Sequence, residues 1–166
     1  MSVSEHRSKA NDPVRCKVIT VSDTRTKDTD KSGALIIELL TREQMEIIDY
    51  EIVKDEREAI QSAVKEASDE IDVFLLNGGT GFTKRDVTVE AVKELLDKEM
   101  VGFGELFRYL SYKEIGSASM LSRALAGSIG QKVIFCMPGS TNAVRLAMEK
   151  LILPELRHLV WEMNRQ

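Results

Sequence analysis

The most informative stretch of the chain lies near its middle and reads Asp72-Val73-Phe74-Leu75-Leu76-Asn77-Gly78-Gly79-Thr80-Gly81-Phe82-Thr83-Lys84-Arg85-Asp86-Val87-Thr88. Residues 73–76 form a short apolar run of the kind found in buried strands. Three glycines and a threonine follow, and an apolar pattern with helical spacing resumes at Val89. A strand, a glycine turn and a helix place backbone N–H groups beside an anionic ligand. Glycine suits such a turn because it adopts positive φ and lets the backbone approach a phosphate closely.

The same residues also fit a simpler interpretation, a tight strand-to-helix turn in which Asp86 caps the helix and no ligand binds. The stretch carries neither of the common nucleotide-binding fingerprints. It has no G-x-G-x-x-G, and no Lys-Ser or Lys-Thr closes a G-x-x-x-x-G. By itself the stretch therefore predicts an anion near a turn and nothing more specific.

Length and charge exclude several classes of protein. At 166 residues the chain suits one domain, and we predict a single domain at residues 14–166 after a flexible tail at residues 1–13. The net charge of −4 argues against a nucleic-acid-binding surface. No apolar run approaches the ~20 residues of a membrane span, and the polar first residues do not resemble a secretory signal. We expect a cytoplasmic protein with no nucleic-acid or membrane partner.

The two cysteines, Cys16 and Cys136, each lie in an apolar run typical of a strand. Buried free thiols in a reducing compartment explain this placement better than a disulfide or a pair of metal ligands does.

Strand patterns alternate with helical ones along the chain. We predict strands at residues 15–21, 45–53, 73–76 and 132–137. We predict one helix that begins at Ser32, one at residues 56–68, one that ends near Asp97, and two at residues 105–112 and 119–126. A second glycine turn at residues 138–142 is followed by a long helical pattern that runs to Trp161, which Pro154 is expected to kink or restart. Residues 127–130 are predicted to form a turn, and Leu106, Phe107 and Leu110 to face inward. This order predicts an α/β fold with a doubly wound, mostly parallel sheet.

Polar residues follow each predicted strand. Ligands of such sheets bind outside the carboxyl ends of the strands, so these residues are expected to form one site. They are Ser22-Asp23-Thr24 after the first strand, Asp55 after the second, residues 78–81 after the third and Pro138-Gly139-Ser140 after the last.

Two aspartates give this site a candidate chemistry. Asp55 and Asp86 offer the hard oxygen ligands that Mg²⁺ takes together with substrate phosphates, which suits phosphoryl or nucleotidyl transfer. Alternatively, each aspartate caps the helix that follows it. Nearby cations that could pair with phosphates or remain solvated are Lys84, Arg85, Arg108 and Arg123.

Several ordered motifs give the chain a family resemblance. Residues 77–81 and Arg85-Asp86-Val87-Thr88 resemble the G-G-T-G…R-D-V-T signature of the molybdopterin-binding proteins of molybdenum cofactor biosynthesis, the MoaB/Mog family that includes the gephyrin G domain. The resemblance extends from residue 14 to residue 153, and residues 102–108 and 138–141 resemble the MoaB branch in particular. Further matching segments are Ser22-Asp23-Thr24-Arg25, Ser32-Gly33 and Ser122-Arg123-Ala124.

The resemblance implies a three-layer α/β/α fold, trimers or hexamers, and a reaction in which molybdopterin and Mg-ATP give adenylyl-molybdopterin and pyrophosphate. It implies that Asp86 and Asp55 are catalytic and hold Mg²⁺, and that a later, molybdate-inserting enzyme is a partner. It also implies a set of substrate-binding residues, namely Ser22, Asp23, Gly78, Gly79, Thr80, Gly81, Arg85, Ser122, Pro138, Gly139 and Ser140.

Three functional hypotheses remain open at this point. Both aspartates are present, which favours an adenylyltransferase, but Thr141 stands where family adenylyltransferases commonly have proline. The second hypothesis is an oligomer that holds or transfers molybdopterin without modifying it, and the third is an unrelated nucleotide-binding α/β domain. The apolar C-terminal residues fit either a subunit interface or packing against the sheet; they are Leu156, Leu159, Val160 and Trp161.

Overall fold

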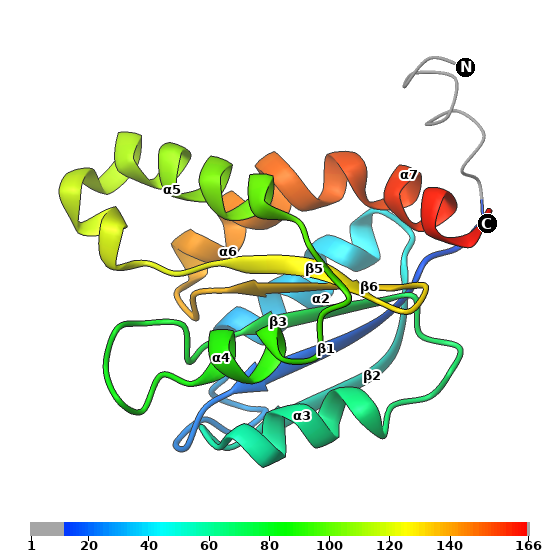
Figure 1. Ribbon diagram of the computed structural model, residues 1–166, viewed down its shortest axis with the longest axis horizontal. Helices are drawn as coiled ribbons and strands as arrows, with labels where there is room; N and C mark the ends of the chain where they lie inside the picture. Colours follow the sequence, from blue (N-terminus) through cyan, green and yellow to red (C-terminus); the bar gives the residue numbers. More distant parts are fainter. Residues whose placement is uncertain (1–11, 166) are drawn as a thin grey trace.

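The computed structural model describes residues 12–165, which are built around one six-stranded sheet of order β2-β1-β3-β6-β5-β4 (Figure 1). The predicted tail at residues 1–13 lies almost wholly outside the described residues. Four strands are parallel, and their bounds lie close to the predicted ones: β1 (Arg15–Val21), β2 (Glu46–Val53), β3 (Val73–Asn77) and β6 (Lys132–Met137). The prediction of a mostly parallel α/β sheet is confirmed.

The register of the parallel strands aligns their carboxyl ends. Asn77, the last residue of β3, pairs with Thr20 near the end of β1 and with Met137 at the end of β6. The loops that follow these three strands therefore emerge at the same side of the sheet, on the left in Figure 1.

The helix predicted at residues 119–126 is wrong, and so are the bounds of the turn predicted at residues 127–130. A 3₁₀ helix, η1 (Gly116–Leu121), precedes β5 (Leu125–Ile129), which pairs antiparallel with β6 and with β4 (Lys98–Glu99). A tight turn at Gly130, with φ of +59°, closes the β5–β6 hairpin. A Cβ atom on Gly127 would lie 2.3 Å from the carbonyl oxygen of Lys98, so glycine is what allows the two strands to approach.

Helices cover both faces of the sheet and make three layers (Figure 1). One face is covered by α3 (Arg57–Lys65) and α4 (Thr88–Lys93). The other is covered by α2 (Lys31–Arg42), α5 (Val101–Ile115), α6 (Thr141–Ala147), the π-helical segment η2 (Met148–Ile152) and α7 (Leu153–Asn164). None of the helices within residues 12–165 is long and apolar enough to cross a membrane.

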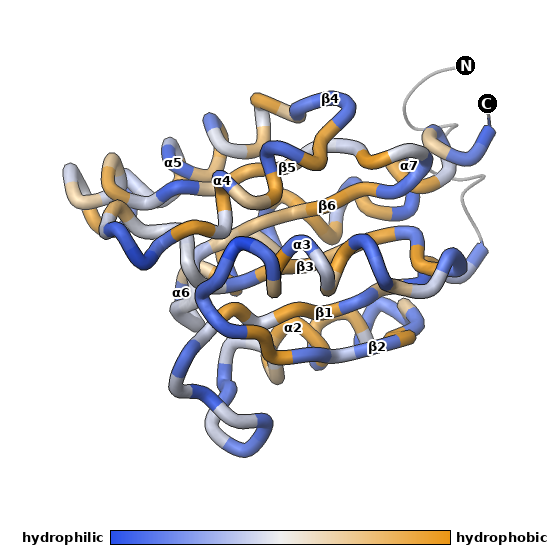
Figure 2. The backbone as a smooth tube through the Cα atoms, turned by 60° about the horizontal axis from the view of Figure 1, so that its bottom comes forward, coloured by the Kyte–Doolittle hydropathy of each residue, from blue (hydrophilic) through white to orange (hydrophobic). Residues whose placement is uncertain are grey.

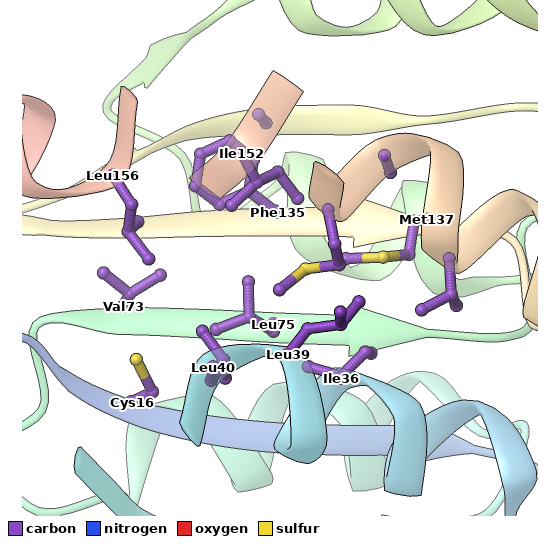
Figure 3. Packing of buried hydrophobic residues seen from close by; sticks show 14 of the residues in the cluster. Cys16, Ile36, Leu39, Leu40, Val73, Leu75, Phe135, Met137, Ile152 and Leu156 are labelled. Carbon is purple, nitrogen blue, oxygen red and sulfur yellow. The ribbon is translucent and has the colours of Figure 1, made fainter. Parts of the chain in front are cut away.

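The core lies on the two faces of the central strands. Figure 3 shows Leu75 of β3 between Leu39 of α2 and Phe135 of β6, and Figure 2 shows β6 as hydrophobic along most of its length. Cys16 and Cys136 are buried free thiols, as predicted. Burial raises the pKa of the Cys16 thiol to about 12, which keeps it protonated and unreactive.

The structure tests two predictions about the helices, namely the effect of Pro154 and the side chains of α5 that face inward. Pro154 is the second residue of α7, directly after the π-helical segment η2, so the α-helical pattern is interrupted near the proline that was predicted to kink or restart it. In α5, Phe107 is buried as predicted, but Leu106 is 52% exposed. Phe103, which packs edge-on against Phe135, is the other buried aromatic residue of α5.

Of the four C-terminal residues that fit either a subunit interface or packing against the sheet, two pack in the core. Leu156 and Val160 are buried on the α2 face of the sheet, whereas Leu159 and Trp161 are only partly buried.

Candidate functional site

A cavity of about 400 Å³ lies where β1, β3 and β6 end. Its position agrees with the general rule that ligands of parallel sheets bind at the carboxyl ends of the strands. The structure brings together most of the predicted site residues along its walls, namely Ser22, Asp55, Gly78, Gly79, Thr80, Gly81, Asp86, Ser122, Pro138 and Gly139.

The glycine turn after β3 forms the centre of the cavity. Gly78 has φ of +95°, and a Cβ atom there would lie 2.3 Å from the carbonyl oxygen of Val21. Gly79 has φ of +67°, and a Cβ atom there would lie 2.3 Å from Thr88 Oγ1. Thr88, the first residue of α4, fixes the turn, because its Oγ1 donates to the Gly78 carbonyl at 2.8 Å and its N–H donates to the Gly79 carbonyl at 3.0 Å. A side chain at either glycine would displace this turn.

Asp86 is held by the loop rather than by the helix. Its Oδ2 accepts hydrogen bonds from Thr83 Oγ1 at 2.6 Å and from the Thr83 N–H at 3.0 Å. The Thr83 hydroxyl is the main reason why the pKa of Asp86 is lowered. The alternative that Asp86 caps α4 is wrong, because Val87 is the N-cap residue and no side chain makes the capping hydrogen bond.

Asp55 reaches the cavity from the loop after β2. The alternative that it caps α3 is also wrong, since the helix begins at Arg57 and Glu56 occupies the N-cap position. Within residues 12–165, no donor hydrogen-bonds to the Asp55 carboxylate. Burial raises its pKa, and the nearby negative charge of Asp86 raises it further.

Two carboxylates facing one cavity fit a divalent cation. A cation between Asp55 and Asp86 would relieve the repulsion that raises the Asp55 pKa, and Mg²⁺ characteristically takes one or two carboxylates plus phosphate oxygens and water. In the part of the chain that the structure describes, no group of three or more His, Cys, Asp or Glu side chains could hold a metal. The remaining ligands of such a cation would therefore come from substrate phosphates and water.

Arg123 clamps the glycine turn to the segment that carries Asp86. Its Nε donates to the carbonyl oxygens of Thr80 and Gly81, both at 3.0 Å, and its Nη2 donates to the carbonyl oxygen of Asp86 at 3.1 Å. The guanidinium also pairs with Glu90 of α4 and lowers the pKa of that carboxyl. One side chain thus holds three backbone carbonyls of the site in a fixed arrangement.

Three predicted site residues lie outside the cavity lining. Asp23 accepts a hydrogen bond from the Asp55 N–H at 3.0 Å and forms an ion pair with Arg85, so it supports the loop that carries Asp55. Ser140 is the N-cap residue of α6, where its hydroxyl accepts from the Ala143 N–H at 3.1 Å.

Thr24, which was expected at this edge of the sheet, also lines the cavity. Three lining residues were not among the predicted site residues, namely Val21, Arg25 and Leu121. Arg25 belongs to the matching segment at the end of β1, so the signal for it was present. Leu121 comes from η1, far along the chain, and no pattern in the sequence indicates that it reaches the cavity.

Comparisons with known proteins identify the relatives of this chain. Residues 17–158 match a family model described as a probable molybdopterin binding domain. The chain is 62% identical to molybdenum cofactor biosynthesis protein B of Bacillus cereus, over the whole of both chains. A crystal structure of a molybdenum cofactor biosynthesis protein B aligns with a TM-score of 0.91 at 62% identity, over 93% of this chain and 98% of that one. The crystal structure of the tungsten cofactor synthesizing protein MoaB from Pyrococcus furiosus aligns with a TM-score of 0.82 at 43% identity, over 90% and 96%.

Proposed function

Because the chain belongs to the MoaB/Mog family of molybdenum cofactor biosynthesis proteins, we propose that it binds molybdopterin in the cavity and adenylylates it with Mg-ATP. The observation that carries the proposal is that Asp55 and Asp86, from different loops, face the cavity formed by the glycine turn. A site that only bound a pterin phosphate would gain nothing from two carboxylates, which repel it. Carboxylates are useful where a cation and a triphosphate must also bind.

The proposed reaction transfers an adenylyl group. A terminal phosphate oxygen of molybdopterin attacks the α-phosphorus of ATP; a new P–O bond forms, the bond to the β-phosphate breaks, and pyrophosphate leaves. Within residues 12–165, the backbone N–H groups of Gly79 and Thr80 donate to no acceptor, so they are available to phosphate oxygens. Mg²⁺ bound by Asp55 and Asp86 would supply charge neutralisation at the triphosphate.

In this proposal the protein contributes mainly by positioning the reactants. The Thr83 hydrogen bonds orient the Asp86 carboxylate, and the Arg123 clamp fixes the turn that binds phosphate. Holding two reactants in line supplies much of the rate of such transfers.

The test is product formation by purified protein supplied with molybdopterin, ATP and Mg²⁺. Asp86→Asn should lower the rate of adenylyl-molybdopterin and pyrophosphate formation by roughly 100-fold while leaving pterin binding nearly unchanged. Asp69→Asn removes an exposed carboxylate before the start of β3, at the opposite end of the strand, and serves as the matched control. If the wild type binds molybdopterin but forms no adenylate, the protein is a carrier, and the second hypothesis replaces the first.

We further propose that the chain assembles into a homo-oligomer through α5. Leu106, Tyr109, Tyr112 and Ile115 recur at every third residue of this helix, and each is more than half exposed. An exposed apolar surface of this kind is typical of a protein–protein interface, and the family resemblance implies trimers or hexamers. Sedimentation equilibrium should show an oligomer, and the double variant Tyr109→Lys/Tyr112→Lys should dissociate it. A monomeric wild type would refute this proposal.

A further inference from the structure

Within the described residues, Arg25 is the one cationic side chain that lines the cavity. It comes from the loop after β1, and its side chain is 34% exposed. Its Nη2 donates to the Gly139 carbonyl at 3.0 Å, and its Nη1 lies 3.7 Å from Oδ1 of Asp30. A guanidinium has five N–H groups in one plane, and within the described residues the bond to Gly139 is the one hydrogen bond that this side chain makes, so its other N–H groups are available to a ligand.

The carboxylate behind Arg25 is rigidly held. The Asp30 side chain is fully buried and accepts hydrogen bonds from Thr20 Oγ1 at 2.6 Å, from the Gly33 N–H at 3.0 Å and from the Tyr50 hydroxyl. Thr20 Oγ1 in turn accepts from Asn77 Nδ2 at 2.9 Å. This network ties the end of β1 to β3 and to the start of α2, and it places a fixed negative charge behind the guanidinium.

A purely structural role accounts for Asp30 but not for Arg25. Asp30 is the N-cap residue of α2, so its burial is explained without the arginine. The distance of 3.7 Å from Arg25 Nη1 to Asp30 is too long for a hydrogen bond. Arg25 is therefore aligned by Asp30 and by Gly139, while most of its donors are not used by the protein.

We propose that Arg25 binds the terminal phosphate of the pterin substrate, an inference that rests on the proposed function of the same cavity. The reaction brings two anions together, the pterin phosphate and the triphosphate of ATP. In the proposed reaction, Asp55 and Asp86 hold the cation that binds the triphosphate. The attacking phosphate therefore needs a separate positive charge. The planar guanidinium matches a phosphate with two parallel hydrogen bonds, and it lies beside the glycine turn that offers backbone N–H groups.

Affinity measurements with two pterin probes test the assignment of Arg25 without relying on catalysis. The probes are a stable oxidised, phosphorylated pterin derivative of molybdopterin and its phosphatase-treated form, and affinities are measured by fluorescence titration. Arg25→Gln should weaken binding of the phosphorylated form by roughly 10- to 100-fold and of the dephosphorylated form by less than about 3-fold. Arg42→Gln makes the same charge change on the exposed side of α2, in an ion pair with Glu38, and should alter neither affinity. Mg-ATP affinity should change little in either variant.

The outcomes separate this assignment from the proposed function. If Arg25→Gln loses affinity equally for both pterin forms, or loses affinity for Mg-ATP alone, the assignment of Arg25 is overturned even if the wild type is an adenylyltransferase. A phosphate-specific loss in a protein that makes no adenylate would support the assignment and refute the catalytic proposal. Thermal unfolding of each variant identifies any loss of affinity that comes from an unfolded protein.

Discussion

Replacing Arg123 should destabilise the site and the whole fold measurably. In Arg123→Met the carbonyl oxygens of Thr80, Gly81 and Asp86 lose charged donors. Each such hydrogen bond contributes about 1.5–3 kcal/mol, but Nε is shared between two carbonyls, and water can reach these groups from the cavity. The exposed pair with Glu90 adds only about 0–1 kcal/mol. We expect a loss of about 2–4 kcal/mol in the free energy of unfolding, which lowers the Tm by roughly 4–16 °C.

Differential scanning calorimetry and urea denaturation measure this loss. Arg145→Met is the matched control, because Arg145 forms an exposed pair with Glu149 one turn away and should contribute only a few tenths of a kcal/mol. Arg123→Lys should recover less than half of the loss, since one ammonium group cannot reach three carbonyls. The structural role of Arg123 would be disproved if Arg123→Met lost no more free energy of unfolding than Arg145→Met, or if Arg123→Lys restored the wild-type stability in full.

Three further predictions concern the carboxylates and the glycine turn. Asp55→Asn should raise the Tm at neutral pH without Mg²⁺, because burial and the charge of Asp86 raise the pKa of the Asp55 carboxyl and penalise its ionised form in the folded state. This gain should be smallest below about pH 3 and grow as the pH rises through the raised pKa; a gain independent of pH in calorimetry would contradict it. Thr83→Val removes the hydroxyl that lowers the Asp86 pKa, so that pKa should rise in an NMR titration, and an unchanged value would show that the hydroxyl has no such effect. Gly78→Ala places a Cβ atom 2.3 Å from the Val21 carbonyl oxygen at a φ of +95°, and it should cost at least about 2 kcal/mol in urea denaturation. A cost below about 0.5 kcal/mol would mean that the turn tolerates a side chain.

The local patterns of the sequence determined the central elements. The predicted strands at residues 15–21 and 132–137 have the bounds of β1 and β6, because runs of β-branched and apolar residues satisfy a buried strand wherever it lies. The glycine turn was also predictable, since glycine adopts the positive φ of Gly78 and Gly79 without the steric cost that a side chain brings. Alternation of strands and helices then predicted that Asp55 and the glycine turn would meet at one edge of the sheet, and both line the cavity.

Tertiary contacts decided what the local patterns could not. Residues 125–129 form β5 because Gly127 lets β4 approach and β6 offers a pairing edge, although their local pattern indicates the end of a helix followed by a turn. The Arg123 clamp joins Arg123 to residues 37 to 43 positions away, and Gly139, from beyond the last strand, accepts a hydrogen bond from Arg25. Whether an arginine is solvated or fixed against a cavity depends on such distant partners, which exist only once the chain has folded.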